Sequence, residues 1–121
     1  MRPEDAEAGA LWDLVEAVRR LVRLTSTEAF ARLKEDEYFS LAVEKLIQNV
    51  GEMARRMPEA FRRRHDDIPW GDIIGQRNII AHNYDALLPE LLWKSATVRA
   101  PKLLDRLLPL LDAEPPTDSE T

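Results

Sequence analysis

Apolar residues recur at intervals of three and four positions along most of the chain, a spacing that places them on one face of an α-helix. No segment alternates apolar and polar residues with β-branched enrichment, and no Asn-Gly or Asp-Gly hairpin turn occurs. The pattern therefore predicts an all-α protein. The first helix is expected over roughly residues 5–24, and its apolar stripe consists of Leu11, Leu14, Val15, Val18, Leu21 and Val22.

A second long helix is expected to begin near Asp36 and to extend to about Met57. Between the two long helices, Thr25–Glu28 has the pattern of a capping box that would open a short helix. Gly51 lies inside the second long helix and favours close helix packing there. The apolar stripe of this helix consists of Phe39, Val43, Leu46, Ile47, Val50, Met53, Ala54 and Met57.

Prolines and aspartates mark the remaining helix boundaries. Pro58 predicts a break or the first turn of a short helix. The run Asp66–Pro69 is a helix-start signal, and the helix that follows is expected to continue towards Tyr84. Pro89 opens the last helix, which Pro101 should kink because proline removes a backbone donor and crowds the preceding turn.

Composition is consistent with one helical domain, because 121 residues of which 45% are hydrophobic can form one core. Short connections favour antiparallel neighbours, so we expect an antiparallel four- to five-helix bundle over residues 1–113 and a disordered acidic tail over residues 114–121. The chain has no cysteine, which excludes disulfides, thiolate zinc sites and cysteine nucleophiles. Its two histidines are too few for a histidine-rich metal site.

No apolar run approaches the roughly 20 residues that span a bilayer, and the acidic N-terminus does not resemble a signal peptide. We therefore expect a cytoplasmic protein with no membrane partner. The net charge of −5 argues against a general nucleic-acid coat. However, residues 53–65 carry five arginines, including Arg62, Arg63 and Arg64, against one glutamate. This basic run is either a solvated helix face or a local anion-binding surface.

Residues 68–84 concentrate the polar side chains of greatest chemical interest. At about 100° per residue, Arg77 and Tyr84 fall inside the apolar arc of the helix, whereas Asn78 and His82 lie at its edge. Arginine is rarely buried without a partner. Arg77 therefore either meets a carboxylate in the core or faces a second subunit with an anion-binding site between the two. Considered alone, His82 is equally explained as a helix cap and Tyr84 as a packing residue.

The order of residue types in this segment is also distinctive. It reads Arg77-Asn78-Ile79-Ile80-Ala81-His82-Asn83-Tyr84. This pattern resembles the signature of the HEPN superfamily and, more closely, that of its HepT branch. The resemblance extends to Ile68–Trp70, to Ala42–Met57 and to Trp93, eleven residues past the histidine. Asp85 and Pro89 differ from the residues expected after the motif, which bears on loop shape rather than on catalysis.

The resemblance implies a helical bundle that forms a homodimer through the motif helix and acts as a metal-independent ribonuclease without a cofactor. RNA, with tRNA among the candidates, would be its substrate. It also implies the toxin of a toxin–antitoxin pair, whose partner, a small nucleotidyltransferase, silences the toxin by transferring AMP to the motif tyrosine. Carried over by position, Arg77 and His82 would be catalytic, Asn78 and Asn83 would support them, and Tyr84 would be modified.

The residue types suit this chemistry, because RNA carries its own nucleophile in the 2′-OH. A histidine can take or give protons near neutral pH, and a guanidinium can hold the negative phosphorane. A two-fold dimer would supply two of each. Arg62, Arg63 and Arg64 are candidates for contacts to RNA phosphates, and His65 is expected on the surface.

Two alternatives stay open. The chain could be a catalytically inactive helical dimer that binds a nucleotide or a nucleotidyltransferase, which its net acidity favours. It could also be a structural bundle in which the polar motif caps a helix and Arg77 pairs with a carboxylate in its own core.

Overall fold

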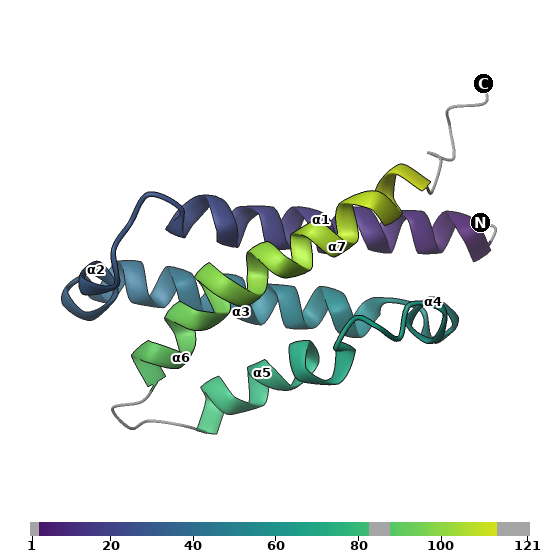
Figure 1. The fold of residues 1–121 in the computed structure, drawn as a ribbon. Coiled ribbons are helices and arrows are strands. Elements are labelled where there is room, and N and C mark those ends of the chain that lie inside the picture. The colour runs from purple at the N-terminus through teal and green to yellow at the C-terminus, as the bar shows by residue number, and fades with distance from the viewer. Residues whose placement is uncertain (1–2, 83–87, 114–121) are drawn as a thin grey trace.

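The fold is seen in a computed structural model that describes residues 3–82 and 88–113, with side chains for residues 5–76 and 89–111. These residues form helices, and none of them lies in a strand (Figure 1). The prediction of an all-α protein is confirmed. The elements are α1 (Pro3–Thr25), α2 (Phe30–Glu35), α3 (Glu37–Arg56), α4 (Glu59–Arg64), α5 (Trp70–His82), α6 (Leu88–Lys94), the π-helical turn η1 (Ser95–Arg99) and α7 (Ala100–Ala113).

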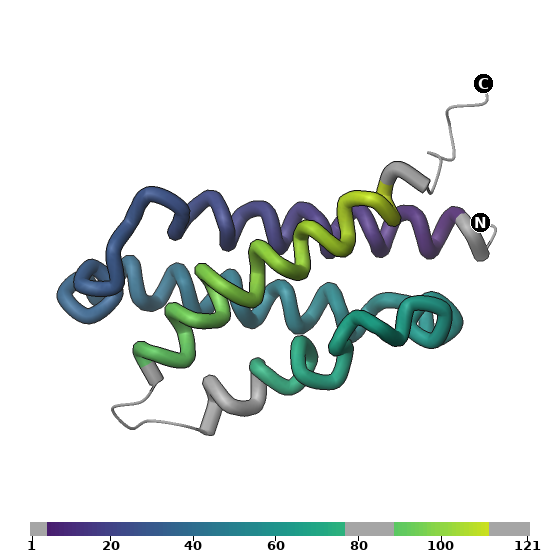
Figure 2. Tube along the Cα trace, viewed as in Figure 1, coloured from purple at the N-terminus to yellow at the C-terminus, as the bar shows by residue number. Residues whose placement is uncertain are grey.

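The long helices form an antiparallel bundle. α3 lies between α1 and α5 and runs opposite to both, and α7 packs along α1 in the opposite direction (Figure 2). The short helices α2 and α4 lie at the two ends of α3 (Figure 1). The predicted bundle architecture is therefore confirmed. The proposed tail, residues 114–121, lies outside the described residues, and no described helix is both long and apolar enough to cross a membrane.

The predicted apolar stripes form the core. In α1, Leu11, Leu14, Val15 and Val18 are completely buried, and α3 buries Gly51 together with most of its stripe. Burial of each large aliphatic side chain contributes roughly 1.5–3 kcal/mol to folding. The described core residues with under 2% exposure and the largest volumes are Phe61, Leu11, Leu14, Ile47, Met57, Leu107, Val15, Val18 and Val43.

The connection between α1 and α2 differs from the capping box that the sequence predicts. The Thr25 hydroxyl donates to the Leu21 carbonyl at 3.1 Å, so it satisfies the end of α1 instead of opening α2. Glu28 pairs with Arg32 at 2.7 Å, and α2 begins after Ala29 without a side-chain cap. The prediction is wrong because α1 includes Thr25, and a threonine inside a helix can donate back to the carbonyl four residues earlier.

The boundary of α3 follows its sequence signal. The Phe39 N–H donates to Asp36 Oδ1 at 3.1 Å, the bond expected of a helix N-cap. This bond, together with the nearby Arg32 guanidinium, lowers the pKa of the Asp36 carboxyl below its usual value. The predicted start of the second long helix near Asp36 is therefore confirmed.

The chain before Pro101 forms a π-helical turn between α6 and α7. In η1, the Ala100 N–H donates to the carbonyl of Ser95, five residues earlier. Pro101 has no N–H to donate, and its ring crowds the carbonyl four residues earlier. A widened turn just before the proline accommodates both effects, so the interruption that the sequence predicts at Pro101 takes the form of a π-turn.

Candidate active site

An aromatic anchor fixes the start of α5, the helix that carries the motif. Phe61 of α4 is fully buried and contacts the Trp70 ring edge-on, with the ring centroids 6.2 Å apart. The Trp70 indole N–H donates to the His65 carbonyl at 2.9 Å, and Ile68 is buried beside them. The Ile68–Trp70 segment thus holds the first turn of α5 against the end of α3 and α4.

From this anchor, α5 runs back along α3 and places the backbone of Arg77, Asn78 and His82 in its last two turns. His82 is the final residue of the helix. On helical geometry, positions 78 and 82 are one turn apart on the same face, whereas positions 77 and 82 differ by about 140° around the axis. The side chains of these three residues, and all of Asn83 and Tyr84, lie outside the described part of the chain.

The arginines of α4 are not close to this end of α5 within one chain. α4 lies at the end of the bundle where α5 begins, and His82 ends the helix at the far side (Figure 1). Arg64 makes a bidentate ion pair with Glu7 at 2.8 and 3.1 Å, and Arg63 lies 3.7 Å from Glu59. Arg62 Nε is buried without a hydrogen-bond partner among the described atoms.

His65 belongs to the anchor and is only half exposed. Its ring centroid lies 4.5 Å from that of Phe61. The surface position expected from the charged residues around it is therefore only partly correct, because packing on Phe61 covers one side of the imidazole.

The Glu7–Arg64 pair leads to a prediction about acid stability. Hydrogen bonds from Arg64 hold the pKa of the Glu7 carboxyl below its usual value, and the Glu7 side chain is only 14% exposed. Because the folded-state pKa is the lower one, the pair stabilises the fold fully above about pH 4.3 and is lost as the pH falls through the folded-state pKa. Glu7→Gln should lower stability at pH 7 by about 1 kcal/mol or less, since Arg64 is half exposed.

Thermal unfolding measured from pH 7 to pH 3 checks this expectation. The Glu7→Gln variant should lose less stability than the unaltered chain on acidification. Glu59→Gln, which removes an equivalent charge from a carboxylate that is 72% exposed, should leave the curve unchanged. Coincident curves for Glu7→Gln and the unaltered chain would contradict the assignment.

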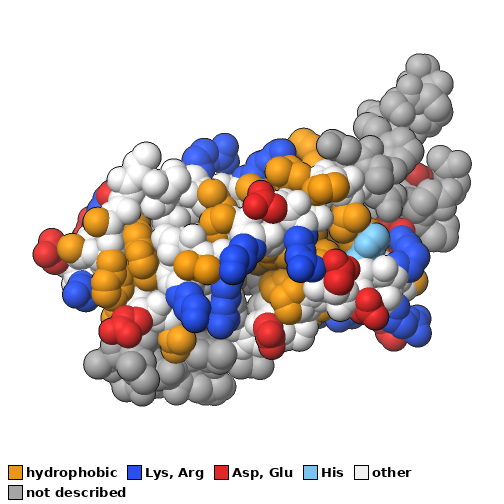
Figure 3. All heavy atoms as spheres, in the orientation of Figure 1, with side chains coloured by type: hydrophobic (Ala, Val, Ile, Leu, Met, Phe, Trp, Pro, Cys, Tyr) orange, Lys and Arg blue, Asp and Glu red, His pale blue; other side chains and the backbone are white. Residues whose placement is uncertain are grey.

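A cavity of about 400 Å³ opens beside α5, and no local sequence pattern predicts it. Its lining includes Ile73 and Gln76 of α5, and Arg99, Lys102 and Arg106 of η1 and α7. In Figure 3, Lys and Arg side chains gather near the middle of this face, next to apolar side chains. The three cations follow helical spacing in the sequence, but only the folded chain shows that they share one cavity.

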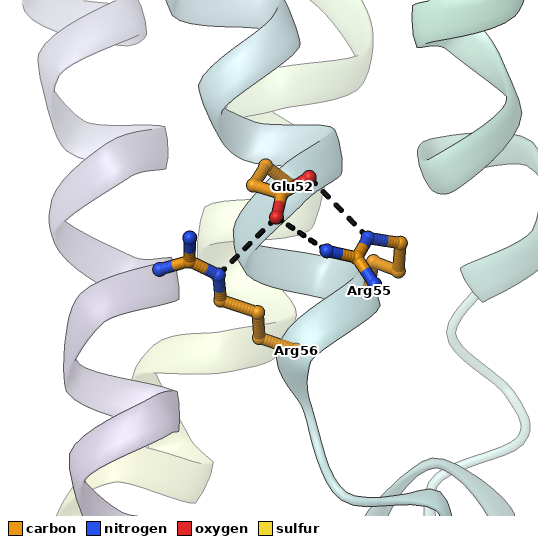
Figure 4. Close-up of polar contacts among 3 residues, drawn as sticks. All are labelled: Glu52, Arg55 and Arg56. Atoms are coloured by element: carbon orange, nitrogen blue, oxygen red, sulfur yellow. Dashed lines mark hydrogen bonds and ion pairs between the residues drawn. The ribbon is translucent and has the colours of Figure 1, made fainter.

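The other arginine pair of the basic run shares one carboxylate partner. Glu52 accepts from Arg55 at 2.6 and 3.3 Å and from Arg56 at 3.2 Å (Figure 4). These bonds, that from Arg55 first, lower the pKa of the Glu52 carboxyl. Together with the Arg63 and Arg64 pairs, they make much of the run a charge-paired helix surface.

Comparison with known proteins identifies the family. A family model described as ribonuclease HepT-like matches residues 14–109, which include the motif that begins on α5. The chain belongs to the HepT-like family. The resemblance seen in the motif is therefore confirmed over most of the domain.

Several curated proteins are similar to this HepT-like chain. It is 28% identical over 93 residues to a Thermococcus cleftensis protein named probable ribonuclease HepT, covering 77% of this chain and 84% of that protein. It is 27% identical over 93 residues to a Methanocaldococcus jannaschii protein named putative RNase MJ1380, covering 77% and 85%. No solved structure gives a significant match.

Metal ligands do not cluster in the described part of this HepT-like chain. No group of three histidine, aspartate or glutamate side chains among those residues is placed to hold a metal ion.

Proposed function

We propose that the chain is a ribonuclease that cleaves RNA without a metal ion, with Arg77 and His82 as its catalytic residues. One observation carries the proposal: the complete Arg-Asn-x3-His-x-Tyr motif begins on α5 in a chain that the HepT-like family model matches over residues 14–109. Both relatives described above carry ribonuclease in their names.

The reaction needs no outside nucleophile. The 2′-oxygen of RNA attacks the adjacent phosphorus, its proton passes to a base, and the P–O5′ bond breaks as an acid protonates the leaving 5′-oxygen. The products are a 2′,3′-cyclic phosphate and a 5′-hydroxyl. The imidazole of His82 supplies proton transfer near neutral pH. The Arg77 guanidinium stays charged and suits the phosphorane oxygens.

One chain offers one motif histidine, whereas the reaction needs a base and an acid. A homodimer that brings two α5 helices together would supply both, along with two arginines. Asn78, one turn before His82 on the same face of α5, and Asn83 are proposed as supporting polar residues. Arg62, Arg63 and Arg64 are proposed to contact phosphates farther along the RNA. The Arg63 side chain is more exposed than that of Arg64, at 73% against 50%.

Incubation of the purified chain with total tRNA tests the ribonuclease proposal. We expect metal-independent cleavage in the presence of a chelator, with 2′,3′-cyclic phosphate ends on the products. Intact RNA under these conditions, together with stable binding of a nucleotidyltransferase, would contradict the ribonuclease and favour the catalytically inactive binding module.

We further propose that the chain is the toxin of a toxin–antitoxin pair and that a cognate nucleotidyltransferase silences it by transferring AMP to Tyr84. The transfer joins the tyrosine oxygen to the α-phosphorus of ATP and releases pyrophosphate. The motif places Tyr84 two residues after His82. Added AMP would bring bulk and negative charge near the catalytic residues, which opposes the binding of RNA phosphates.

Co-expression with the proposed partner nucleotidyltransferase tests this regulation. Mass spectrometry should find AMP on the peptide that contains Tyr84, and growth arrest caused by the chain alone should be relieved. The Tyr84→Phe variant should still arrest growth but resist silencing, because phenylalanine has no oxygen to modify. Modification elsewhere, or full silencing of Tyr84→Phe, would contradict the assignment of Tyr84.

A further inference from the structure

The cavity beside α5 has the size and construction of a ligand site. Its volume of about 400 Å³ lies within the range of small-molecule pockets. The lining comes from α1, α3, α5, η1 and α7, so separate parts of the sequence meet around one space. Its inner surface is apolar, with Ile47 and Val50 of α3 and Leu103 of α7 among the lining residues.

Two of the cations that line this cavity have no anionic partner among the described residues. Arg99 and Lys102 are exposed, and no ion pair or hydrogen bond engages either side chain among the described residues. Arg106 is different, because it donates to the Asp67 carboxylate at 2.9 Å and to the Asp67 carbonyl at 2.8 Å. Residues three apart on a helix are neighbours, with their Cβ atoms about 5–6 Å apart, so Arg99 and Lys102 can bind one phosphate together.

The α5 wall supplies polar groups of the kind that read a nucleobase. Gln76 carries both a donor and an acceptor, and Asp72 carries an acceptor. Amide and carboxylate groups bind the polar edges of bases, whereas the apolar floor suits the flat face of a base. Gln76 directly precedes Arg77, which places the cavity on the motif helix.

We propose that this cavity binds one nucleotide of an RNA strand, with its phosphate on Arg99 and Lys102 and its base against the apolar floor near Ile73. The inference rests on the proposed ribonuclease function and deepens it, because it assigns a substrate subsite next to the motif. Gln76 and Asp72 then contribute to the choice of base. The phosphate contacts hold the strand in register with Arg77 and His82 without reading its sequence.

RNA binding by a cleavage-deficient chain tests the phosphate part of the proposal. In a His82→Ala background, fluorescence anisotropy would follow a labelled single-stranded RNA of mixed sequence at several salt concentrations. The Arg99→Gln/Lys102→Gln variant should bind this RNA at least about tenfold more weakly. The magnitude of the slope of log affinity against log salt should fall by about 0.7, because one phosphate is no longer neutralised.

A matched control uses two arginines of α3 that already share a carboxylate partner. Arg55→Gln/Arg56→Gln removes the same net charge from arginines that Glu52 already holds, so it should change RNA affinity much less. Equal weakening by the two double variants would overturn the subsite, because it would show a general charge effect. Unchanged affinity in Arg99→Gln/Lys102→Gln would also overturn it.

Methyl NMR of the unaltered chain tests the base part. The methyl signals of Ile47, Val50 and Ile73 should shift on addition of at least one nucleoside 5′-monophosphate, because the ring of the base lies against them. Inorganic phosphate should leave these signals in place. No shift with any of the four nucleotides, or the same shift with inorganic phosphate, would overturn the base-binding role.

These measurements separate the subsite from the proposed ribonuclease. Loss of affinity in Arg99→Gln/Lys102→Gln supports the subsite even if the unaltered chain never cleaves RNA. Cleavage by the unaltered chain with unchanged affinity in that variant would uphold the ribonuclease and remove the subsite.

Discussion

Replacing His82 with alanine is expected to slow RNA cleavage by about 10² to 10⁴-fold, the usual contribution of a general acid or base. Arg77→Ala should cost about 10² to 10³-fold, because it removes a charged donor from the phosphorane. Single-turnover cleavage of a labelled RNA measures both losses. Helical content and thermal unfolding of each variant are measured alongside, so that a loss of folding is distinguished from a loss of catalysis.

The other histidine provides the matched control. His65 packs against Phe61 near the start of α5, so His65→Gln should retain cleavage. If His65→Gln slowed cleavage as much as His82→Ala, the proton-transfer role would have to be assigned to His65 as well. Cleavage at the unaltered rate by His82→Ala would contradict the catalytic assignment altogether.

The shared site can be tested by mixing the unaltered chain with the His82→Ala variant. If two motif helices build one site that uses both histidines, a mixed dimer keeps one histidine and lacks either the base or the acid. Refolding the unaltered chain with an excess of His82→Ala should therefore lower cleavage per unaltered chain well below that of the unaltered dimer. Undiminished cleavage per unaltered chain in verified mixed dimers would contradict the shared site.

Phe61→Ala is expected to have the largest effect on stability, a loss of about 3–5 kcal/mol. Phe61 is fully buried, and its ring contacts Trp70 and His65. Its removal leaves a cavity between α4 and the first turn of α5, and the fixed neighbouring helices prevent full collapse. Urea unfolding followed by circular dichroism measures the loss, which should appear as a lower midpoint with an unchanged slope.

An aromatic residue on the surface supplies the comparison. Tyr38 is 84% exposed, so Tyr38→Ala should change the free energy of unfolding by about 0.5 kcal/mol or less. Similar losses for Tyr38→Ala and Phe61→Ala would show that Phe61 does not anchor α5.

The fold was largely predictable because helical periodicity reports burial directly. The stripes on α1 and α3 are buried as expected, and Asp36 caps α3. Where two local rules compete, the sequence does not decide between them. Thr25 could open α2 or close α1, and only the extent of α1 shows that its hydroxyl donates to Leu21.

The site was predictable in one part only. The motif from Arg77 to Tyr84 is contiguous in sequence, so its residue types and spacing could be read without a structure. Which arginines of the basic run are paired could not be predicted, because the partner of Arg64 is Glu7, more than fifty positions away in the chain. Charge counts do not reveal such pairing.

The sequence by itself determined the helical class, the main core stripes and the motif, because each depends on residues that are close along the chain. Only the tertiary structure decided which charges are neutralised and which surround a cavity. Arg99 and Lys102 lie more than twenty positions from Gln76, and the packing of α7 on α1, and of α5 on α3, brings them to one space. Such long-range proximity follows from how helices pack, which local periodicity does not specify.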